Sequence, residues 1–293
     1  MDTYHHLTLD GERALYGLED AHILSCTFDG PADGESALKE CRRIQVEDCD
    51  FRLRYPLWHA QGAAIRRCRM EEGCRAALWY DRDVTLQDCT LEGIKALREC
   101  DRVTLENCRA ASEEFGWLCR ELHLWECEIR SAYAFFQSRD ITADHLRLEG
   151  KYAFQYVRNA RISHAVLDTK DAFWHSVGVT VTDSVIKGEY LGWYAEDLHL
   201  IRCKLIGTQP LCYDKGLVLE DCEMVDTDLA FENSEVHATV RGEILSIKNP
   251  LHGRIEADRI GETILDSHLA PDADCVIVTS PIREHVHKGE KSP

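Results

Sequence analysis

Cysteine recurs along this chain at a fixed interval. Cys89, Cys108 and Cys127 lie nineteen residues apart, and the same interval separates Cys203 from Cys222. Between these groups the equivalent positions hold small or apolar residues: Leu146, Ala165 and Ser184. The series extends toward the N-terminus through Cys68, Cys49 and Cys26, with slightly longer intervals from Cys89 to Cys68 and from Cys49 to Cys26. A period of this length indicates a solenoid built from stacked repeats.

The residues around each cysteine alternate between apolar and polar. The stretch 84–91 reads Val-Thr-Leu-Gln-Asp-Cys-Thr-Leu, and 198–205 and 217–224 repeat the pattern. Alternation with a period of two predicts strands. Nineteen residues suit one coil of short strands and tight bends, so equivalent residues of stacked coils should lie about 4.8 Å apart. The pattern predicts an all-β fold, a single-stranded right-handed parallel β-helix with about 19 residues per coil, its handedness taken from the general crossover rule.

The repeat also predicts the domain organisation. Because the repeat is continuous, we expect one domain rather than two. We expect an N-terminal cap at 1–13, β-helix repeats at 14–250, and a C-terminal cap and tail at 251–293.

Composition narrows the cellular setting and the partners. The start of the chain shows no signal peptide, and no apolar run is long enough to span a membrane. We expect the fourteen cysteines to be buried, reduced thiols, which favours a cytoplasmic location. With 52 acidic and 34 basic residues, the net charge of −18 argues against nucleic acid and anionic membranes as partners. No Cys-x-x-Cys occurs, so we expect no metal site, and no cofactor is indicated.

A chemically distinct strip precedes each cysteine. Ten positions before the cysteine stand five of the six tryptophans: Trp58, Trp79, Trp117, Trp174 and Trp193. The positions nine and thirteen before it are polar or aromatic. The two positions between these columns, eleven and twelve before the cysteine, are apolar. Because two adjacent apolar positions break strand alternation, we expect a bend or bulge there.

Two interpretations of this strip remain open. On the first interpretation the rings stack inside the coil, with tyrosine hydroxyls at the edge. Alternatively, the strip forms a groove along the solenoid, where aromatic faces beside charged groups suit sugars. On the second interpretation the predicted ligand-binding residues are Lys95, Trp117, Tyr133, Tyr152, Tyr156, Trp174, Tyr190, Trp193 and Tyr194.

Candidate catalytic residues lie in the same strip. Asp171 and His175 occupy one coil and are the predicted acid and base. Glu114 lies three coils from Asp171, roughly 14 Å away, which is too far for both to act on one bond. We therefore assign Glu114 and Glu232 as supporting carboxylates. A pair such as Lys95 with Glu114 is also compatible with an ordinary salt bridge across the sheet.

Several phrases of the strip resemble a known family. They are Leu-Arg-Glu-Cys at 97–100, Glu-Glu-Phe-Gly-Trp at 113–117, Lys-Tyr-Ala-Phe-Gln-Tyr at 151–156, Asp-Thr-Lys-Asp-Ala-Phe-Trp-His at 168–175, Gly-Glu-Tyr-Leu-Gly-Trp-Tyr at 188–194, Gly-Thr-Gln-Pro-Leu-Cys-Tyr at 207–213 and Asp-Thr-Asp-Leu-Ala-Phe-Glu at 226–232. They are similar to the uncharacterised domain-of-unknown-function family 3737, over about 11–249. The resemblance implies a pectin-lyase-like right-handed β-helix and brings no activity or catalytic residues.

Three classes of function are consistent with these features. The first is a carbohydrate-active enzyme of lyase or hydrolase type that acts on a short sugar or glycosyl derivative. The second is a module that binds a small sugar-like ligand or metabolite without turnover. The third is a scaffold in which the strip is the interface of a homo-oligomer, where aromatic residues are equally expected. The sequence leaves open whether the protein is an enzyme.

Overall fold

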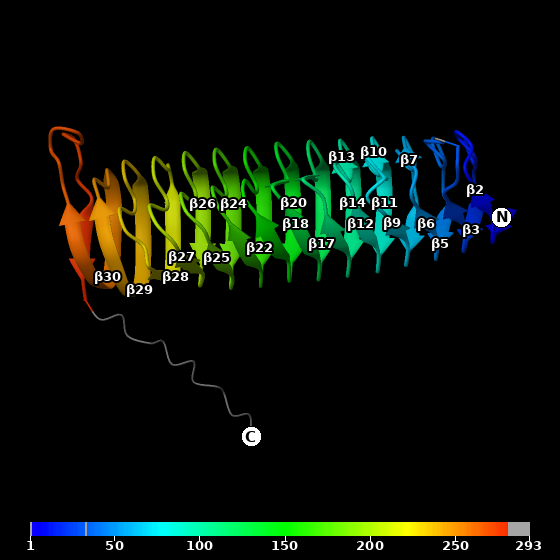
Figure 1. Cartoon of the computed structure of the whole chain (residues 1–293). Helices are drawn as coiled ribbons and strands as arrows, with labels where there is room; N and C mark the ends of the chain where they lie inside the picture. The colour runs from blue at the N-terminus through cyan, green and yellow to red at the C-terminus, as the bar shows by residue number, and fades with distance from the viewer. Residues whose placement is uncertain (1, 33, 281–293) are drawn as a thin grey trace, which may run out of the picture.

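The computed structural model describes residues 2–32 and 34–280 as one stack of parallel coils. Successive coils follow one another in a row from the N-terminal end to the C-terminal end (Figure 1). Every strand pairing between named strands is parallel, and no helix occurs among the described residues. The predicted all-β parallel β-helix is confirmed. No described helix is therefore long and apolar enough to cross a membrane.

Three strand series build the coils. The first comprises β1 (Asp2–His5), β3 (Ala21–Leu24), β5 (Gln45–Glu47), β8 (Ala64–Arg66), β11 (Arg82–Gln87), β14 (Asp101–Glu106), β17 (Arg120–Trp125), β20 (Arg139–Asp144), β22 (Arg158–Ser163), β24 (Val177–Thr182) and β26 (Glu196–Ile201). The second comprises β2 (Thr8–Leu9), β4 (Thr27–Phe28), β6 (Asp50–Phe51), β9 (Arg69–Met70), β12 (Thr90–Glu92), β15 (Arg109–Ala111), β18 (Glu128–Ser131), β21 (Arg147–Gly150), β23 (Val166–Thr169), β25 (Val185–Lys187) and β27 (Lys204–Ile206). Three longer strands follow at the C-terminal end, β28 (Leu217–Val225), β29 (Glu235–Lys248) and β30 (His252–Ile264), and the short β31 (Val276–Thr279) comes last. The third, short series comprises β7 (Leu57–Trp58), β10 (Leu78–Trp79), β13 (Leu97–Arg98), β16 (Glu114–Phe115) and β19 (Tyr133–Ala134).

Strand register reproduces the sequence period. Val84 of β11 lies opposite Val103 of β14, nineteen residues on. The ladder continues beyond the range 14–250 at both ends, because β1 pairs with β3 and β30 pairs with β31. Strand β1 in the segment expected as an N-terminal cap, and strands β30 and β31 in the segment expected as a C-terminal cap, thus belong to the ladder. Residues 281–293 of the expected tail lie outside the described part of the chain.

Inward-facing side chains form continuous ladders in the core. Phe135 and Phe154 stack with ring centroids 4.8 Å apart, and Phe154 and Phe173 with centroids 5.3 Å apart. All fourteen cysteines are free, and only Cys275 is not fully buried. The recurring thiols also bond to backbone: the Cys108 Sγ lies 3.3 Å from the Glu106 carbonyl oxygen. Ser184 fills the same position because its hydroxyl bonds in the same way to the Thr182 carbonyl.

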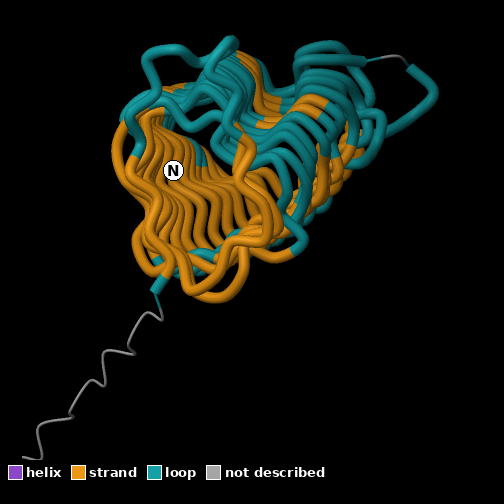
Figure 2. Tube along the Cα trace, turned by 90° about the vertical axis from the view of Figure 1, so that its left-hand side faces the viewer, coloured by secondary structure: helices purple, strands orange, loops and turns teal. Residues whose placement is uncertain are grey.

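Corners of the coil adopt left-handed backbone. The expected bend lies at the two adjacent apolar positions, where Phe135, Phe154 and Phe173 have φ of 64°, 59° and 64°. Two residues further on, Tyr156 and His175 also have positive φ. Viewed along the solenoid, loops and turns collect on one side of the coils (Figure 2). The predicted bend is therefore confirmed, and it exposes the side chains that follow it.

One coil near the C-terminus is a residue longer than the others. Ile206 pairs with Val225 at the usual interval, but the amide of Gln209 donates to the Asp228 carbonyl and that of Tyr213 to the Glu232 carbonyl. In the preceding coils, the amide equivalent to that of Tyr213 donates to the carbonyl of the residue ten positions before the cysteine. Glu232 therefore lies in the column that contains the tryptophans. Counting at a uniform nineteen-residue interval instead places Glu232 in the column of His175, nine positions before the cysteine.

Candidate functional site

A groove of about 970 Å³ runs across several successive coils. One wall is the exposed column nine positions before the cysteine: His59, Tyr80, Glu99, Leu118, Gln137, Tyr156 and His175. The other wall is the column seven before it: Gln61, Arg82, Asp101, Arg120, Arg139 and Arg158. Between them lie small residues: Ala60, Cys100, Cys119 and Ser138. Because these small side chains point inward and are buried, the surface is hollow along this corner.

The first wall of the groove carries stacked rings. His175 lies between Tyr156 and Tyr194, with centroid distances of 4.9 and 5.1 Å and interplanar angles of 8° and 6°. His59 and Tyr80 stack in the same way at 5.1 Å. Since each ring face covers the next, the ring edges, with the tyrosine hydroxyls and imidazole nitrogens, are what remains exposed. The wall thus offers hydrogen-bonding groups rather than the aromatic faces expected from the sequence.

The second wall of the groove is basic. Arg120 forms a two-point ion pair with Asp101, through nitrogen–oxygen distances of 2.7 and 2.9 Å. Arg82, Arg139 and Arg158 are exposed and have no carboxylate partner among the described residues. Arg139 lies directly opposite both Arg120 and Arg158 on the neighbouring coils. Three positive side chains therefore occupy consecutive rungs in a chain whose net charge is −18.

The predicted ligand-binding residues divide between two surfaces. Tyr156 lines the groove, and Tyr194 continues its ring stack. The tryptophans turn away, as the Trp174 indole nitrogen donates to the Tyr190 carbonyl at 2.7 Å. Equivalent bonds hold Trp117 and Trp193, which places these indoles over the column that also contains Lys95, Tyr133 and Tyr152. These residues share one turn of the coil but not one groove.

The predicted acid and base are not in contact. Asp171 is buried, and desolvation raises the pKa of its carboxyl, opposed by the nearby Lys170 and Lys151. His175 is exposed within its ring stack. No hydrogen bond or ion pair joins Asp171 to His175 in the part of the chain that the structure describes. Their catalytic pairing stays a prediction.

The two supporting carboxylates are ion-paired. Glu114 lies 3.8 Å from the Lys95 ammonium and 3.6 Å from the Arg98 guanidinium. Glu232 is 8% exposed and lies 2.8 Å from the ammonium of Lys248. Glu232 also accepts a weak hydrogen bond from the Gln209 amide at 3.4 Å. Both carboxylates have the partners expected of structural salt bridges.

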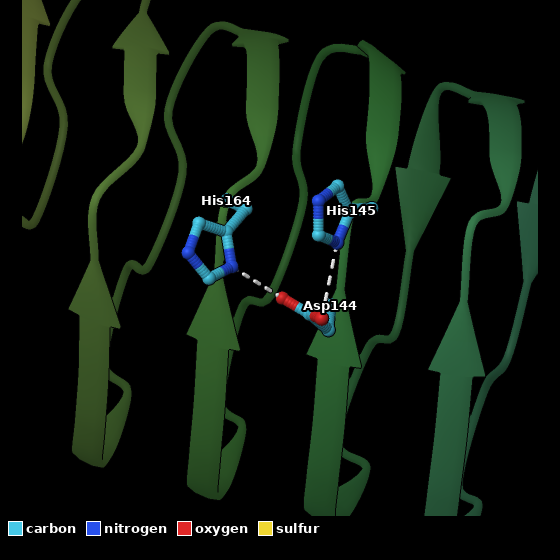
Figure 3. A group of neighbouring side chains, drawn as sticks. All are labelled: Asp144, His145 and His164. Carbon is cyan, nitrogen blue, oxygen red and sulfur yellow. Dashed lines mark hydrogen bonds and ion pairs between the residues drawn. The ribbon is translucent and has the colours of Figure 1, made fainter.

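A second cluster lies on another edge of the solenoid. The Asp144 carboxylate is 3.0 Å from the His145 Nδ1 and 2.7 Å from the His164 Nδ1 (Figure 3). These ligand-type atoms lie within 4.8 Å of one another. The Ser163 hydroxyl donates to Asp144 at 2.7 Å. The three hydrogen bonds hold the pKa of Asp144 at about 2, against the opposing effect of burial.

Sequence reasoning missed both features. The arginine column could have been found from its spacing, because Arg120, Arg139 and Arg158 follow the nineteen-residue interval. His145 and His164 follow the same interval directly before the cysteine position. Charged residues are common on outward strand positions. The sequence alone does not show which of them form ion pairs and which remain unpaired, so these columns were not singled out.

The chain belongs to the family described as "Protein of unknown function (DUF3737)", whose match covers residues 2–278. The structure therefore defines this family member as a parallel β-helix protein. Among curated proteins, none matches the chain.

Similar solved structures include PfbA, a surface adhesin of Streptococcus pneumoniae, at 10% identity and a TM-score of 0.40, covering 89% of this chain and 81% of that one. A mutant tailspike protein of E. coli bacteriophage HK620, in complex with a pentasaccharide, has 8% identity and a TM-score of 0.46, covering 90% and 60%. The A-module of the Azotobacter vinelandii mannuronan C-5 epimerase AlgE6 has 10% identity and a TM-score of 0.36, covering 96% and 89%. At these values no activity or residue role is transferred to this chain.

Proposed function

We propose that the groove binds a short, extended, acidic oligosaccharide. The observation that carries this proposal is the row of arginines opposite the stacked ring edges. Within the described part of the chain, Arg139 and Arg158 lack carboxylate partners, although acidic residues outnumber basic ones by 52 to 34. Like charges directly opposite one another on neighbouring strands are destabilising. An anionic ligand that bridges these side chains would remove this repulsion.

The groups in the groove suit a sugar acid. Arginine presents a planar fork of donors that matches a carboxylate or a sulfate. Gln137 and the edges of Tyr156 and His175 supply donors and acceptors for hydroxyl groups. Equivalent arginines lie about 4.8 Å apart, so successive charged sugar units can be met by successive coils.

Single-stranded nucleic acid fits the groove less well. Such ligands stack their bases on exposed aromatic faces. In the Tyr156–His175–Tyr194 stack those faces already cover one another. The acidic balance of the rest of the chain would also repel a long polyanion.

The residues of the groove support binding of the oligosaccharide without its cleavage. Its carboxylates are held by arginines: Glu99 lies 3.1 Å from Arg98, and Asp101 is paired with Arg120. A glycosidase needs two carboxyl groups free to act on either side of one bond. The observation that favours an enzyme instead is Asp171, a buried carboxyl whose pKa is raised as a general acid requires.

The test is calorimetric titration with oligogalacturonate, compared with a neutral oligosaccharide of equal length and with single-stranded DNA. Replacing Arg139 or Arg158 by Gln should weaken oligogalacturonate binding about tenfold to a hundredfold, as loss of a charged hydrogen bond costs about 1.5–3 kcal/mol. Arg161 is an exposed arginine on strand β22 with no ion pair among the described residues, so Arg161→Gln is the matched control.

Four outcomes would contradict the proposal. Equal binding of the neutral sugar would remove the role of charge, and equal binding of DNA would indicate non-specific attraction. Unchanged affinity in both arginine variants would place the site elsewhere. Cleavage of the sugar that is abolished by Asp171→Asn would show that the protein is an enzyme.

A further inference from the structure

We propose that Asp144, His145 and His164 form a binding site for a divalent transition-metal ion of the zinc type. The cluster joins two neighbouring coils, because Asp144 ends β20 and His164 follows β22 (Figure 3). It lies at the opposite end of β20 from the groove residue Arg139, about 17 Å away along an extended strand. The site is therefore independent of the proposed function.

The three side chains present the donor set of a transition-metal site. Two imidazoles and one carboxylate combine the nitrogen and oxygen ligands that Zn²⁺ accepts in open sites, with further positions left for water. Calcium and magnesium prefer oxygen ligands, so two imidazoles select against them. Both Nδ1 atoms point to the Asp144 carboxylate, that of His145 to Oδ2 at 3.0 Å and that of His164 to Oδ1 at 2.7 Å, so the three side chains already lie together.

Neighbouring groups orient and favour such a site. The Ser163 hydroxyl holds one oxygen of Asp144, as outer partners of ligating carboxylates commonly do. The His145 and His164 rings stack at 4.9 Å, which fixes their mutual orientation.

Without metal, each Nδ1 bonds to the carboxylate. With metal, the Nδ1 lone pairs coordinate the ion and the ring protons reside on Nε2. This change needs only a tautomeric shift of two side chains that are about half exposed, at 52% and 53%. The ion would then link the coils that contain β20 and β22.

The experiment is a calorimetric titration of the full chain with Zn²⁺, together with thermal denaturation in its presence and absence. Both measurements are repeated on a sample whose accessible thiols have been blocked. One equivalent of Zn²⁺ should bind and raise the melting temperature, whereas Mg²⁺ and Ca²⁺ should not. Co²⁺ should give visible absorption bands, which report nitrogen and oxygen coordination directly. Asp144→Asn and His164→Ala should each weaken Zn²⁺ binding at least about tenfold.

Two control variants make the result decisive. His123→Ala removes an exposed histidine from strand β17 and leaves the cluster intact. His5→Ala breaks the contact between the rings of His5 and His6, which also lie next to each other. Both should bind Zn²⁺ as the unaltered chain does. Loss of binding in His5→Ala but not His164→Ala would overturn the proposal, as would the absence of Zn²⁺ binding to the unaltered chain.

Discussion

Asp81 makes the stability of this protein depend on pH in an unusual direction. Its side chain is fully buried, and its Oδ1 accepts the Ala60 amide at 2.7 Å while Oδ2 has no hydrogen-bond partner. Desolvation raises the pKa of Asp81 well above the ordinary 3.8, because burial favours the protonated carboxyl over the carboxylate in the folded chain. Asp214 repeats this arrangement with the Ala195 amide. In other coils the same position is filled by an alanine, valine, serine or cysteine: Ala60, Cys100, Cys119, Ser138, Val157, Ser176 and Ala195.

The sign follows from proton linkage. Above pH 3.8 the unfolded chain has lost the Asp81 proton, whereas the folded chain keeps it until the raised pKa is reached. Between these two pKa values, the free energy of unfolding falls by about 1.4 kcal/mol for each pH unit per group. The contribution of Asp81 to stability is thus complete below pH 3.8 and is lost as the pH rises.

Asp81→Asn removes this dependence and keeps an oxygen for the Ala60 amide. The new amide nitrogen adds a cost of about 1–3 kcal/mol that does not vary with pH. The variant should therefore be less stable than the original at pH 5 and recover relative to it toward pH 8. The assay is the melting temperature across this range, together with hydrogen exchange of the Ala60 amide, because repeat arrays can unfold coil by coil.

Asp83→Asn is the matched control for Asp81→Asn. Asp83 is partly exposed, and its hydrogen bond with Arg102 lowers the pKa of its carboxyl. That interaction is present above pH 3.8 and lost only in acid, so this control should follow the pH dependence of the original chain between pH 5 and 8. If Asp81→Asn also follows it, the buried carboxyl is not neutral and the reasoning is refuted.

Three further predictions concern the core and the coil spacing. Phe154→Ala should lower the free energy of unfolding by about 3–5 kcal/mol because it opens a cavity in the phenylalanine ladder. Phe154→Leu should lower it by less than about 1.5 kcal/mol. Denaturant titration compares the two variants, and equal losses would contradict the cavity argument. Gly207→Ala should lower the melting temperature strongly, since the added Cβ would lie 1.9 Å from the Gly188 carbonyl oxygen; an unchanged melting curve would show that the coils can separate there. Cys41 is buried whereas Cys275 is partly exposed, so native-state labelling with a thiol reagent should be slow at Cys41 and fastest at Cys275; rapid labelling of Cys41 would contradict a closed core.

The repeat made most of the fold predictable from sequence. A nineteen-residue interval and strand alternation are local properties, and stacking converts them directly into parallel register, as at Val84 and Val103. The end of the regular spacing was not predictable. The extra residue before Asp228 leaves the alternation intact but moves Glu232 by one column, and only the backbone hydrogen bonds reveal the shift.

The site was less predictable than the fold, for a physical reason. Left-handed backbone at each corner decides which way the side chain points, and a column of mixed residues does not display that conformation in sequence. Trp174 and His175 are adjacent in the chain, yet the indole turns to the Tyr190 carbonyl while the imidazole borders the groove. The predicted strip therefore combined two surfaces that the corner separates.

The groove itself limits the size of its ligand. Its unpaired basic side chains end at Arg158, because the next coil places Val177 opposite and the one after places Glu196 there. At the other end, Arg82 is followed by the neutral Gln61. Five rungs from Arg82 to Arg158 span about 19 Å at the spacing of stacked strands. A ligand that extended past either end would meet the uncharged Gln61 or Val177 in place of an arginine, so the charge pattern favours an acidic chain that spans these five rungs.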